Sequence, residues 1–594
     1  MNEISKTFHF DFNHPVNKLW SIVADTPRWG EASGFPKYQS TEQLQADGTV
    51  KVFGKAVIGR FDLCWEEPPA SWIFERWFEQ RRVFQKGPFV SMTTYAEVED
   101  KKPYSSLTIE IRFIPRNLVG YFLARKLTRA FQGKVQQILN TADQLINAEK
   151  PDLFETDFQL SPSARGRVEK AKQAINQTPY GHGLTDRLIE YITTRQEVDL
   201  WTMRPLALAR RWQVEPRHVI ELFLQSVRAG LLESRWDIVC PRCRVSKSKT
   251  YNISDLPDKV HCVACNIDYE KNYARNVELS FSPSPMIRSV EYGHYCRSGP
   301  GASQHIKGQC MLDSGEHRSL PASLPSGEYR IRTLEAGGEL SFDHNSLHLP
   351  KILLRDNQLQ QAGDSVRGQW ELFNKSQVSR TVVIEERSWI RDVLTAERAT
   401  TLQAFRDLFS DQVLRPGDEI AIRNITFLFT DLVDSTKLFA TIGDAGAYHL
   451  VREHYAIMGK VVRSYDGTIV KTVGDGIHAA FMTPEVALLA SIEMQKSIKQ
   501  FKNHACDGEI SIRIGINNGS SISVNLNGRL DYYGKTVNLA ARLEGQGKAG
   551  DITMSKNFVE DPAVAEILQN YDLRKHDVAI KGYDETVAVY QVTP

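Results

Sequence analysis

Two aspartates, Asp431 and Asp475, constrain the C-terminal part of the chain more than any other feature. Asp431 ends the apolar run Ile-Thr-Phe-Leu-Phe-Thr, and Asp475 follows Ile-Val-Lys-Thr-Val between Gly474 and Gly476. β-Branched and aromatic residues predict a buried strand before each aspartate, and the two glycines predict a hairpin tip. Two carboxylates on adjacent strands can hold two Mg²⁺ ions, which activate an attacking oxygen and neutralise a phosphate. The alternative is that the aspartates merely end two strands.

Residues 531–542 favour the metal interpretation. They read Asp-Tyr-Tyr-Gly-Lys-Thr-Val-Asn-Leu-Ala-Ala-Arg. With the two aspartates, this segment resembles the class III nucleotidyl cyclases over residues 421–592, which implies a ferredoxin-like βαββαβ catalytic domain. The resemblance also implies that Asp431, Asp475 and the backbone carbonyl of Leu432 bind two Mg²⁺ or Mn²⁺ ions per active site.

The same resemblance implies a triphosphate site at the start of a helix. The backbone amides of Val433, Asp434, Ser435 and Thr436 would open that helix, where N–H groups and the helix dipole favour anions. The family often has a small residue, commonly glycine, where Asp434 stands. An extra carboxylate there repels a triphosphate unless it faces away or binds metal.

Two further residues carry catalytic roles by resemblance. Asn538 would position the ribose, and Arg542 would stabilise charge on the α-phosphate. The two are four residues apart, so a helix places both on one face. The triphosphate lysine of mammalian enzymes aligns with Ala579 here, and Lys581 either replaces it or is an exposed strand residue.

Lys471 and Asp531 occupy the two positions that read the base in this family. Adenine presents an acceptor at N1 and a donor at N6, which a lysine donor and an aspartate acceptor match. Guanine presents the opposite polarity, and guanylyl cyclases typically carry Glu and Cys there. The other interpretation of Lys471 is an ordinary surface lysine.

These residues predict an adenylate cyclase that converts ATP to 3′,5′-cyclic AMP and pyrophosphate. The family assembles each site from two subunits, so a head-to-tail homodimer with two equal sites is expected. Two alternatives stay open: a cyclase for GTP or a pyrimidine nucleotide, and a sensor that binds nucleotide without turnover.

Length and composition set the frame for the rest of the chain. The 594 residues predict three to five domains, and 41% hydrophobic with 24% charged residues is a globular composition. The net charge of +1 gives no reason to expect nucleic acid or an anionic membrane as partner. No apolar run reaches the roughly 20 residues of a membrane span. The N-terminus lacks a signal-peptide core, and the eight cysteines do not form a disulfide framework, so a cytoplasmic location is expected.

Residues 1–150 predict a strand, a short helix, aromatic-rich strands and a long closing helix. This order, with Pro-Val-Asn-Lys-Leu-Trp at 15–20, resembles the START-like fold of lipid-transfer and polyketide-cyclase proteins. That fold often leaves an apolar cavity between sheet and helix. The hypotheses are an apolar small ligand or a packed, empty core.

Polar residues 151–165 predict a linker, and 166–236 predict a helical unit that resembles a winged helix. Pro205 and Pro216 suit the first turns of two helices. Four nearby arginines raise the alternative of DNA reading, but acidic residues interleave with them, so a structural role is favoured.

Residues 237–276 contain Cys240, Cys243, Cys262 and Cys265 as two Cys-x-x-Cys pairs. This spacing predicts a four-cysteine ribbon around one structural Zn²⁺, with a redox switch as the alternative. Cys64, Cys296, Cys310 and Cys506 are interpreted as ordinary free thiols.

Residues 277–390 alternate short apolar runs with turn residues, which predicts a β-sandwich without a catalytic constellation. Residues 391–418 predict one helix, with Leu402, Phe405, Phe409 and Val413 on one face, interpreted as a dimerising signalling helix or as a helix that packs on its own domain. Ribbon, β-region and cyclase-like domain together are similar to bacterial multidomain cyclases.

Overall fold

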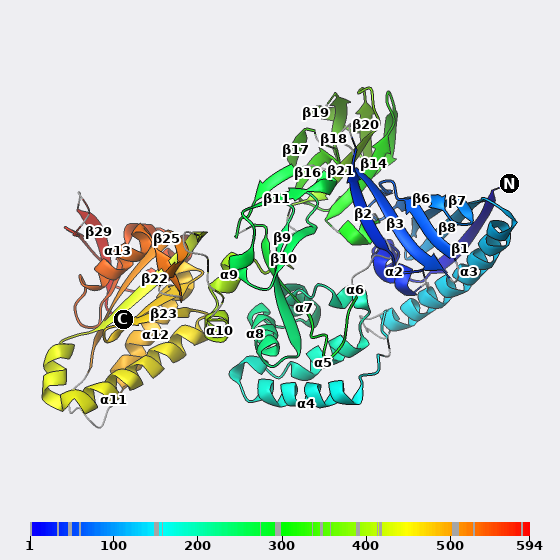
Figure 1. Ribbon diagram of the computed structural model, residues 1–594. Helices are drawn as coiled ribbons and strands as arrows, with labels where there is room; N and C mark the ends of the chain where they lie inside the picture. Colours follow the sequence, from blue (N-terminus) through cyan, green and yellow to red (C-terminus); the bar gives the residue numbers. More distant parts are fainter. Residues whose placement is uncertain are drawn as a thin grey trace.

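The computed structural model shows a mixed α/β chain built from several packed units, with the C-terminal domain at one end (Figure 1). It describes residues 3–594 except 33–34, 46–49, 59–60, 148–153, 157, 266, 274, 292–298, 304, 323, 336, 345–347, 357, 388–391, 411, 413, 415–417, 502–509, 527–528, 582 and 584–585. Cys296, Cys506 and Val413 therefore lie outside the described residues. No described helix has the length and apolar character needed to cross a membrane.

The N-terminal unit follows the expected order of strand, short helix, sheet and long helix. Its elements are β1 (Ile4–Phe12), α1 (Val16–Val23), α2 (Thr26–Ala32), β2 (Gln39–Leu44), β3 (Val50–Ile58), β4 (Phe61–Glu66), β5 (Ser71–Ile73), β6 (Trp77–Lys86), β7 (Phe89–Lys101), β8 (Tyr104–Pro115) and α3 (Leu118–Asn147). Helix α3 packs on β1 and β8 and buries Phe131, Val135 and Ala142. Leu118 and Phe122, which helical spacing assigns to the same stripe, are instead exposed.

The expected β-sandwich is present as two packed sheets, but it is not separate from the N-terminal unit. Its strands are β14 (Ile306–Leu312), β15 (His317–Pro321), β16 (Gly327–Thr333), β17 (Glu339–His344), β18 (Pro350–Arg355), β19 (Gln358–Asp364), β20 (Gln369–Asn374) and β21 (Arg380–Glu386). One sheet runs β14-β21-β16-β17 and the other β15-β20-β18-β19. Strand β14 also pairs with β5, Gln309 opposite Trp72, so one sheet crosses both units. Backbone pairing between such distant residues leaves no local sequence signal.

The helical unit contains α4 (Pro162–Asn176), α5 (Thr185–Thr194), α6 (Glu197–Leu200), α7 (Pro205–Trp212) and α8 (Pro216–Arg228). Pro205 and Pro216 occupy first-turn positions, as expected. Ser161 caps α4 through its side chain, so the end of the expected linker is a helix start. The helical prediction for 166–236 is wrong at its end, because β9 (Leu232–Val239) begins there.

Strand β9 is the centre of a three-stranded sheet with β10 (Ser246–Thr250) and β13 (Val277–Pro283). The boundaries expected at residues 236 and 276 therefore both fall inside one hydrogen-bonded structure. Two short strands complete the region, β11 (Lys259–Cys262) and β12 (Ile267–Glu270). A 3₁₀ turn at Ile253–Asp255 precedes β11, and another at Val263–Cys265 joins β11 to β12. Two more lie at Pro179–Gly181, before α5, and at Pro300–Ser303, after β13.

The single helix predicted over 391–418 is also wrong. Two short helices stand there, α9 (Ala396–Thr400) and α10 (Gln403–Leu408), and Leu402 between them is extended. The carbonyl of Thr400 accepts from the Arg406 side chain six residues further on, and that of Thr401 accepts from the distant Thr468, so side chains take the carbonyls that a continuous helix would use. Phe405 is 1% exposed, which places α10 in a core rather than on a free face.

The C-terminal domain has one mixed sheet in the order β23-β24-β22-β25-β27-β29-β28, with β26 paired to β25. Its elements are β22 (Glu419–Leu432), α11 (Ser435–Ser464), β23 (Thr468–Val473), β24 (Gly476–Phe481), α12 (Pro484–Gln500), β25 (Ile512–Leu526), β26 (Arg529–Tyr533), α13 (Lys535–Glu544), β27 (Ile552–Ser555), α14 (Lys556–Val559), α15 (Pro562–Leu568), β28 (Arg574–Val578) and β29 (Val587–Val592). The order from β22 to β25 is the expected βαββαβ. Leu450 of α11 and Leu488 of α12 pack on Leu428 and Ile516 of the sheet.

Candidate active site and thiol cluster

The tip of the β23–β24 hairpin lies directly against the end of β22. Gly474 adopts a φ of +63°, which suits the tight turn, and Val473 pairs with Gly476. A Cβ atom at Gly476 would lie 1.7 Å from the carbonyl oxygen of Thr430, so only glycine fits there. This contact brings Asp475 beside Asp431.

The electrostatics of Asp431 show how close the two carboxylates are. Burial is the largest cause that raises the pKa of Asp431, and the neighbouring Asp475 carboxylate raises it further. One oxygen of Asp475, Oδ2, is buried without a hydrogen-bond partner among the described residues. Two crowded carboxylates with an unsatisfied oxygen suit a hard divalent cation, so the residues fit Mg²⁺ or Mn²⁺. Leu432, whose carbonyl is the third expected ligand, is the last residue of β22.

Arg513 is a site residue that sequence reasoning missed. It stands opposite Asp431 in the β22–β25 register, and its Nη2 lies 2.6 Å from Asp431 Oδ2. Its Nε contacts Glu544, at the end of α13. The guanidinium lowers the pKa of Asp431 but does not outweigh burial and Asp475. Arg513 sits in an ordinary alternating strand, 82 residues from its partner, so only the register reveals it.

The expected triphosphate helix begins as predicted, with one difference. Helix α11 starts at Ser435 and is preceded by Asp434 in the left-handed region, φ 55° and ψ 27°. Glycine adopts this conformation most easily and aspartate tolerates it, which explains why a position that favours glycine can hold Asp434. The amide of Val433 donates to Ser511 O at 2.9 Å, so it is engaged within the protein and does not join the first-turn amides of Ser435 and Thr436.

The two candidate base-reading residues meet within one chain. Lys471 Nζ lies 2.6 Å from Asp531 Oδ2, from strands at opposite ends of the β23-β24-β22-β25-β26 pairing. Asp531 is buried and its Oδ1 accepts from the Tyr532 amide, whereas Lys471 is half-exposed. His478 stands opposite Lys471 in the β23–β24 register, and burial lowers its pKa to about 3, so the imidazole beside the pair is neutral.

The remaining candidates lie on or after α13. Asn538 and Arg542 are one turn apart on this helix, with Asn538 exposed and Arg542 half-exposed. Lys581 is exposed in a turn after β28. Within the described part of the chain, no hydrogen bond or ion pair joins Lys581 to another candidate residue, so its role stays a prediction.

The four cysteines converge as their spacing predicts. Cys240, Cys243, Cys262 and Cys265 place their sulfur atoms within 4.8 Å of one another, and Cys243 Sγ and Cys262 Sγ are 3.7 Å apart. A tetrahedron with metal–sulfur bonds of about 2.3 Å has edges of about 3.8 Å. The amide of Arg242 donates to Cys240 Sγ at 3.4 Å, a contact that suits a thiolate. The donor set fits Zn²⁺.

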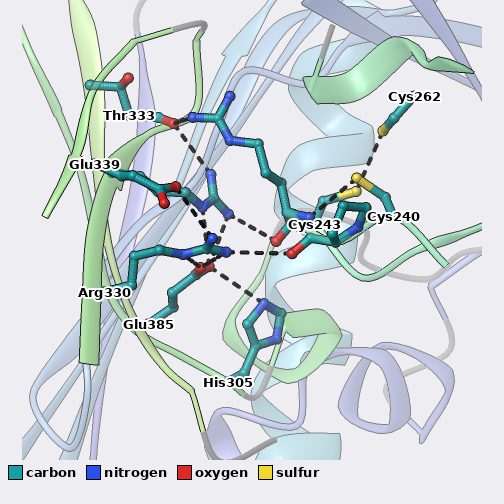
Figure 2. Close-up of polar contacts among 11 residues, drawn as sticks. Cys240, Cys243, Cys262, His305, Arg330, Thr333, Glu339 and Glu385 are labelled. Atoms are coloured by element: carbon teal, nitrogen blue, oxygen red, sulfur yellow. Dashed lines mark hydrogen bonds and ion pairs between the residues drawn. The ribbon is translucent and has the colours of Figure 1, made fainter. Parts of the chain in front are cut away.

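The first cysteine turn also touches the β-sandwich (Figure 2). Arg330 and Arg332 of β16 donate to the carbonyls of Pro241 and Arg242, both at 3.4 Å. Both arginines pair with Glu385, which has no exposed side-chain surface. These hydrogen bonds and ion pairs connect the four-cysteine site to the β-sandwich.

Comparison with known proteins identifies two segments. Residues 419–593 match the family model described as the adenylate and guanylate cyclase catalytic domain. Residues 170–302 match a family of unknown function (DUF5939), which spans the helical unit and the thiol cluster.

Curated relatives match the same C-terminal segment. An adenylate cyclase of Lachancea kluyveri is 32% identical over 179 residues, 26% of this chain and 10% of that protein. One of Anabaena cylindrica is 30% identical over 187 residues, 29% of this chain and 37% of that protein. The receptor-type guanylate cyclase gcy-13 of Caenorhabditis elegans is 29% identical over 27% of this chain and 17% of that protein. The chain therefore spans well under half the length of these relatives.

Solved structures match there too. The adenylyl cyclase CyaB of P. aeruginosa is 26% identical, with a TM-score of 0.27, over 30% of this chain and 96% of that one. The C-terminal domain of this protein is therefore an adenylate/guanylate cyclase catalytic domain.

Proposed function

We propose that this protein is an adenylate cyclase that converts ATP to 3′,5′-cyclic AMP and pyrophosphate. The observation that carries the choice of ATP is the pairing of Lys471 Nζ with Asp531 Oδ2 at 2.6 Å. One side chain is a donor and the other an acceptor, which matches N1 and N6 of adenine. Guanine would leave both groups opposite the wrong partner, at a cost of about 1–3 kcal/mol for each unsatisfied group.

The proposed metal site consists of Asp431, Asp475 and the carbonyl of Leu432. Bound Mg²⁺ or Mn²⁺ would supply charge neutralisation at the phosphates and a lower pKa for the ribose 3′-hydroxyl. The first-turn amides of α11 would hold the triphosphate. Arg513 pairs with Asp431 and would orient this carboxylate toward the metal side.

The remaining roles belong to α13, in a composite site of a head-to-tail homodimer. Asn538 would position the ribose, and Arg542 would stabilise the negative charge that develops at the α-phosphate. Both residues are at least partly exposed, as groups that reach into a partner's site must be. Every role is present once in the chain, so the dimer would hold two equal sites.

Two other functions are distinguished by the same residues. A cyclase for GTP or a pyrimidine nucleotide would need a different base-reading pair, although a guanylate cyclase is among the relatives. A sensor without turnover would not need both aspartates together with Arg542.

A structural Zn²⁺ is proposed at the four cysteines. A site with four thiolates leaves no open position for substrate. It would hold together the β9–β10 and β11–β12 turns, which have few apolar neighbours of their own.

An apolar small ligand is proposed for the N-terminal unit, as in a START-like fold. A cavity of about 420 Å³ lies between the sheet and α3, within the usual size of ligand sites. Trp65, Phe84, Phe113 and Phe131 line it. The buried Arg82 also lines it, and its guanidinium lies 5.1 Å from the Trp65 ring centre. The Arg82 guanidinium already faces the buried Glu67 carboxylate, so a ligand with a mainly apolar body fits this lining best.

Purified protein with Mn²⁺ and each nucleoside triphosphate should yield cyclic AMP as the main product by mass spectrometry. Asp475→Asn should lower turnover by about 10- to 100-fold or more, because an amide is a poorer ligand than a carboxylate. The exposed Asp444→Asn on α11 is the matched control. Full activity of Asp475→Asn at saturating metal, or a different cyclic nucleotide from wild type, would contradict the proposal.

Asp431→Ala and Arg542→Ala should each be inactive alone and active as a co-expressed mixture. In a mixed dimer one site carries both changes and the other carries neither, so activity should reach roughly a quarter of wild type with random pairing. Size-exclusion chromatography with two affinity tags verifies the mixed species. Verified mixed dimers that stay inactive would refute the composite site.

Elemental analysis should find about one zinc per chain after reducing purification. Cys243→Ser should lose the metal and unfold at lower temperature, because structural zinc binding is coupled to folding. Cys64→Ser, outside the cluster, should keep both. A zinc-free wild-type protein would overturn the assignment.

Dodecanoate should bind the N-terminal cavity, measured by isothermal titration calorimetry. Ala130→Trp at the exposed rim should block binding, whereas Gln136→Trp, on the same helix but outside the lining, should not. Binding that is absent, or unchanged by Ala130→Trp, would leave the packed-core interpretation.

A further inference from the structure

Helix α10 lies at the junction between the catalytic domain and the rest of the chain (Figure 1). Phe405 packs edge-to-face on Trp236 of β9, with ring centres 6.0 Å apart. The same core contains Phe427 and Tyr532 of the catalytic sheet. The face of the sheet opposite α11 and α12 is thus continuous with the core of the helical unit.

Two contacts join the chain around the start of α10 to β23, the strand that carries Lys471. One comes from Gln403, the first residue of α10, and the other from Thr401, just before it. Gln403 Oε1 accepts from the amide of Ile469 at 2.7 Å, and the carbonyl of Thr401 accepts from the Thr468 hydroxyl. Strand β23 is an edge strand, so its outer amides need partners outside the sheet. The register shifts between Ile469 and Lys471. By accepting from the Ile469 amide, Gln403 holds the strand next to this register shift. Because a register shift changes the direction of the side chains that follow it, the contact affects the orientation of Lys471.

A third contact joins α10 to β26, the strand that carries Asp531. Arg406 Nη1 donates to the carbonyl of Leu530 at 2.6 Å. Its guanidinium also lies over the Tyr532 ring, 4.9 Å from the centre. Arg406 thus holds the residues on both sides of Asp531, and the Tyr532 amide in turn donates to Asp531 at 2.8 Å.

The helical unit reaches the same residues through a chain of hydrogen bonds. Tyr180 donates to Asp407 Oδ2 at 2.9 Å, and Gln403 Nε2 donates to Asp407 Oδ1 at 2.6 Å. Gln403 then accepts from Ile469. A displacement of the helical unit would therefore act on α10, which contacts β23 through Gln403 and β26 through Arg406.

We propose that Gln403 and Arg406 are positioning residues that set the geometry of Lys471 and Asp531, and so couple the N-terminal units to recognition of the nucleotide base. This inference rests on the proposed function, because it assumes that Lys471 and Asp531 read the base. Neither Gln403 nor Arg406 needs to touch the nucleotide. Their effect is on substrate binding and base choice, because their hydrogen bonds go to the strands that carry Lys471 and Asp531 and not to Asp431 or Asp475.

Kinetics of Arg406→Ala and Gln403→Ala test the proposal. Each should raise KM for ATP and lower the ATP-to-GTP ratio of kcat/KM by about fivefold, the equivalent of about 1 kcal/mol of coupling. The kcat for ATP should change less than KM, and Arg406→Lys should restore part of the ratio. Arg529→Ala, an exposed arginine on β26 two residues from Asp531, is the matched control and should behave like wild type.

A double-mutant cycle separates positioning from general loss of structure. In an Asp531→Ala background, Arg406→Ala should have little further effect on the ATP-to-GTP ratio, because its target is gone. An additive effect, or equal losses in kcat for both nucleotides at unchanged KM, would overturn the inference. The wild-type assay comes first: absence of cyclic nucleotide there refutes the proposed function, whereas an active wild type with an unaltered ratio in the variants refutes only this inference.

Discussion

The contact between the β23–β24 hairpin and the end of β22 is the constraint on which the catalytic domain depends. Gly476 sits so close to the Thr430 carbonyl that no side chain fits between them. The approach brings Asp475 and Asp431 together in a partly buried place, where their charges disfavour each other and the pKa of Asp431 rises. Such an arrangement stores repulsion that a divalent cation relieves. The same hairpin carries Lys471, so one local geometry would serve both the proposed metal site and the proposed base-reading pair.

The sheets and apolar cores of this protein extend across the boundaries between its units. One sheet runs from the N-terminal unit into the sandwich through β5 and β14, and one apolar cluster joins the helical unit to the catalytic sheet through Phe405. The buried Glu385 and its arginines fasten the thiol cluster to the sandwich (Figure 2). Shared cores transmit displacement better than flexible linkers do, because packed interfaces have few alternative arrangements.

Residues 396–409, between the β-sandwich and the catalytic domain, show how side-chain contacts override local helical preference. Leu402, Phe405 and Phe409 keep helical spacing, and the sequence predicts one helix with an apolar face. The carbonyls of Thr400 and Thr401 instead accept from Arg406 and Thr468, and the chain breaks into α9 and α10. Phe405 is then buried in the core, and Leu402 and Phe409 pack against that core partly buried.

The sequence by itself determined the features that depend on neighbours along the chain. These include the strands before Asp431 and Asp475, the hairpin at Gly474, the helix that aligns Asn538 with Arg542, and the spacing that joins the four cysteines. Each follows from local periodicity, turn chemistry or ligand spacing. The tertiary structure alone decided the partners: Arg513 at Asp431, Lys471 at Asp531, β14 beside β5, and Gln403 and Arg406 against β23 and β26. These depend on sheet register and on packing between distant segments, which no local pattern encodes.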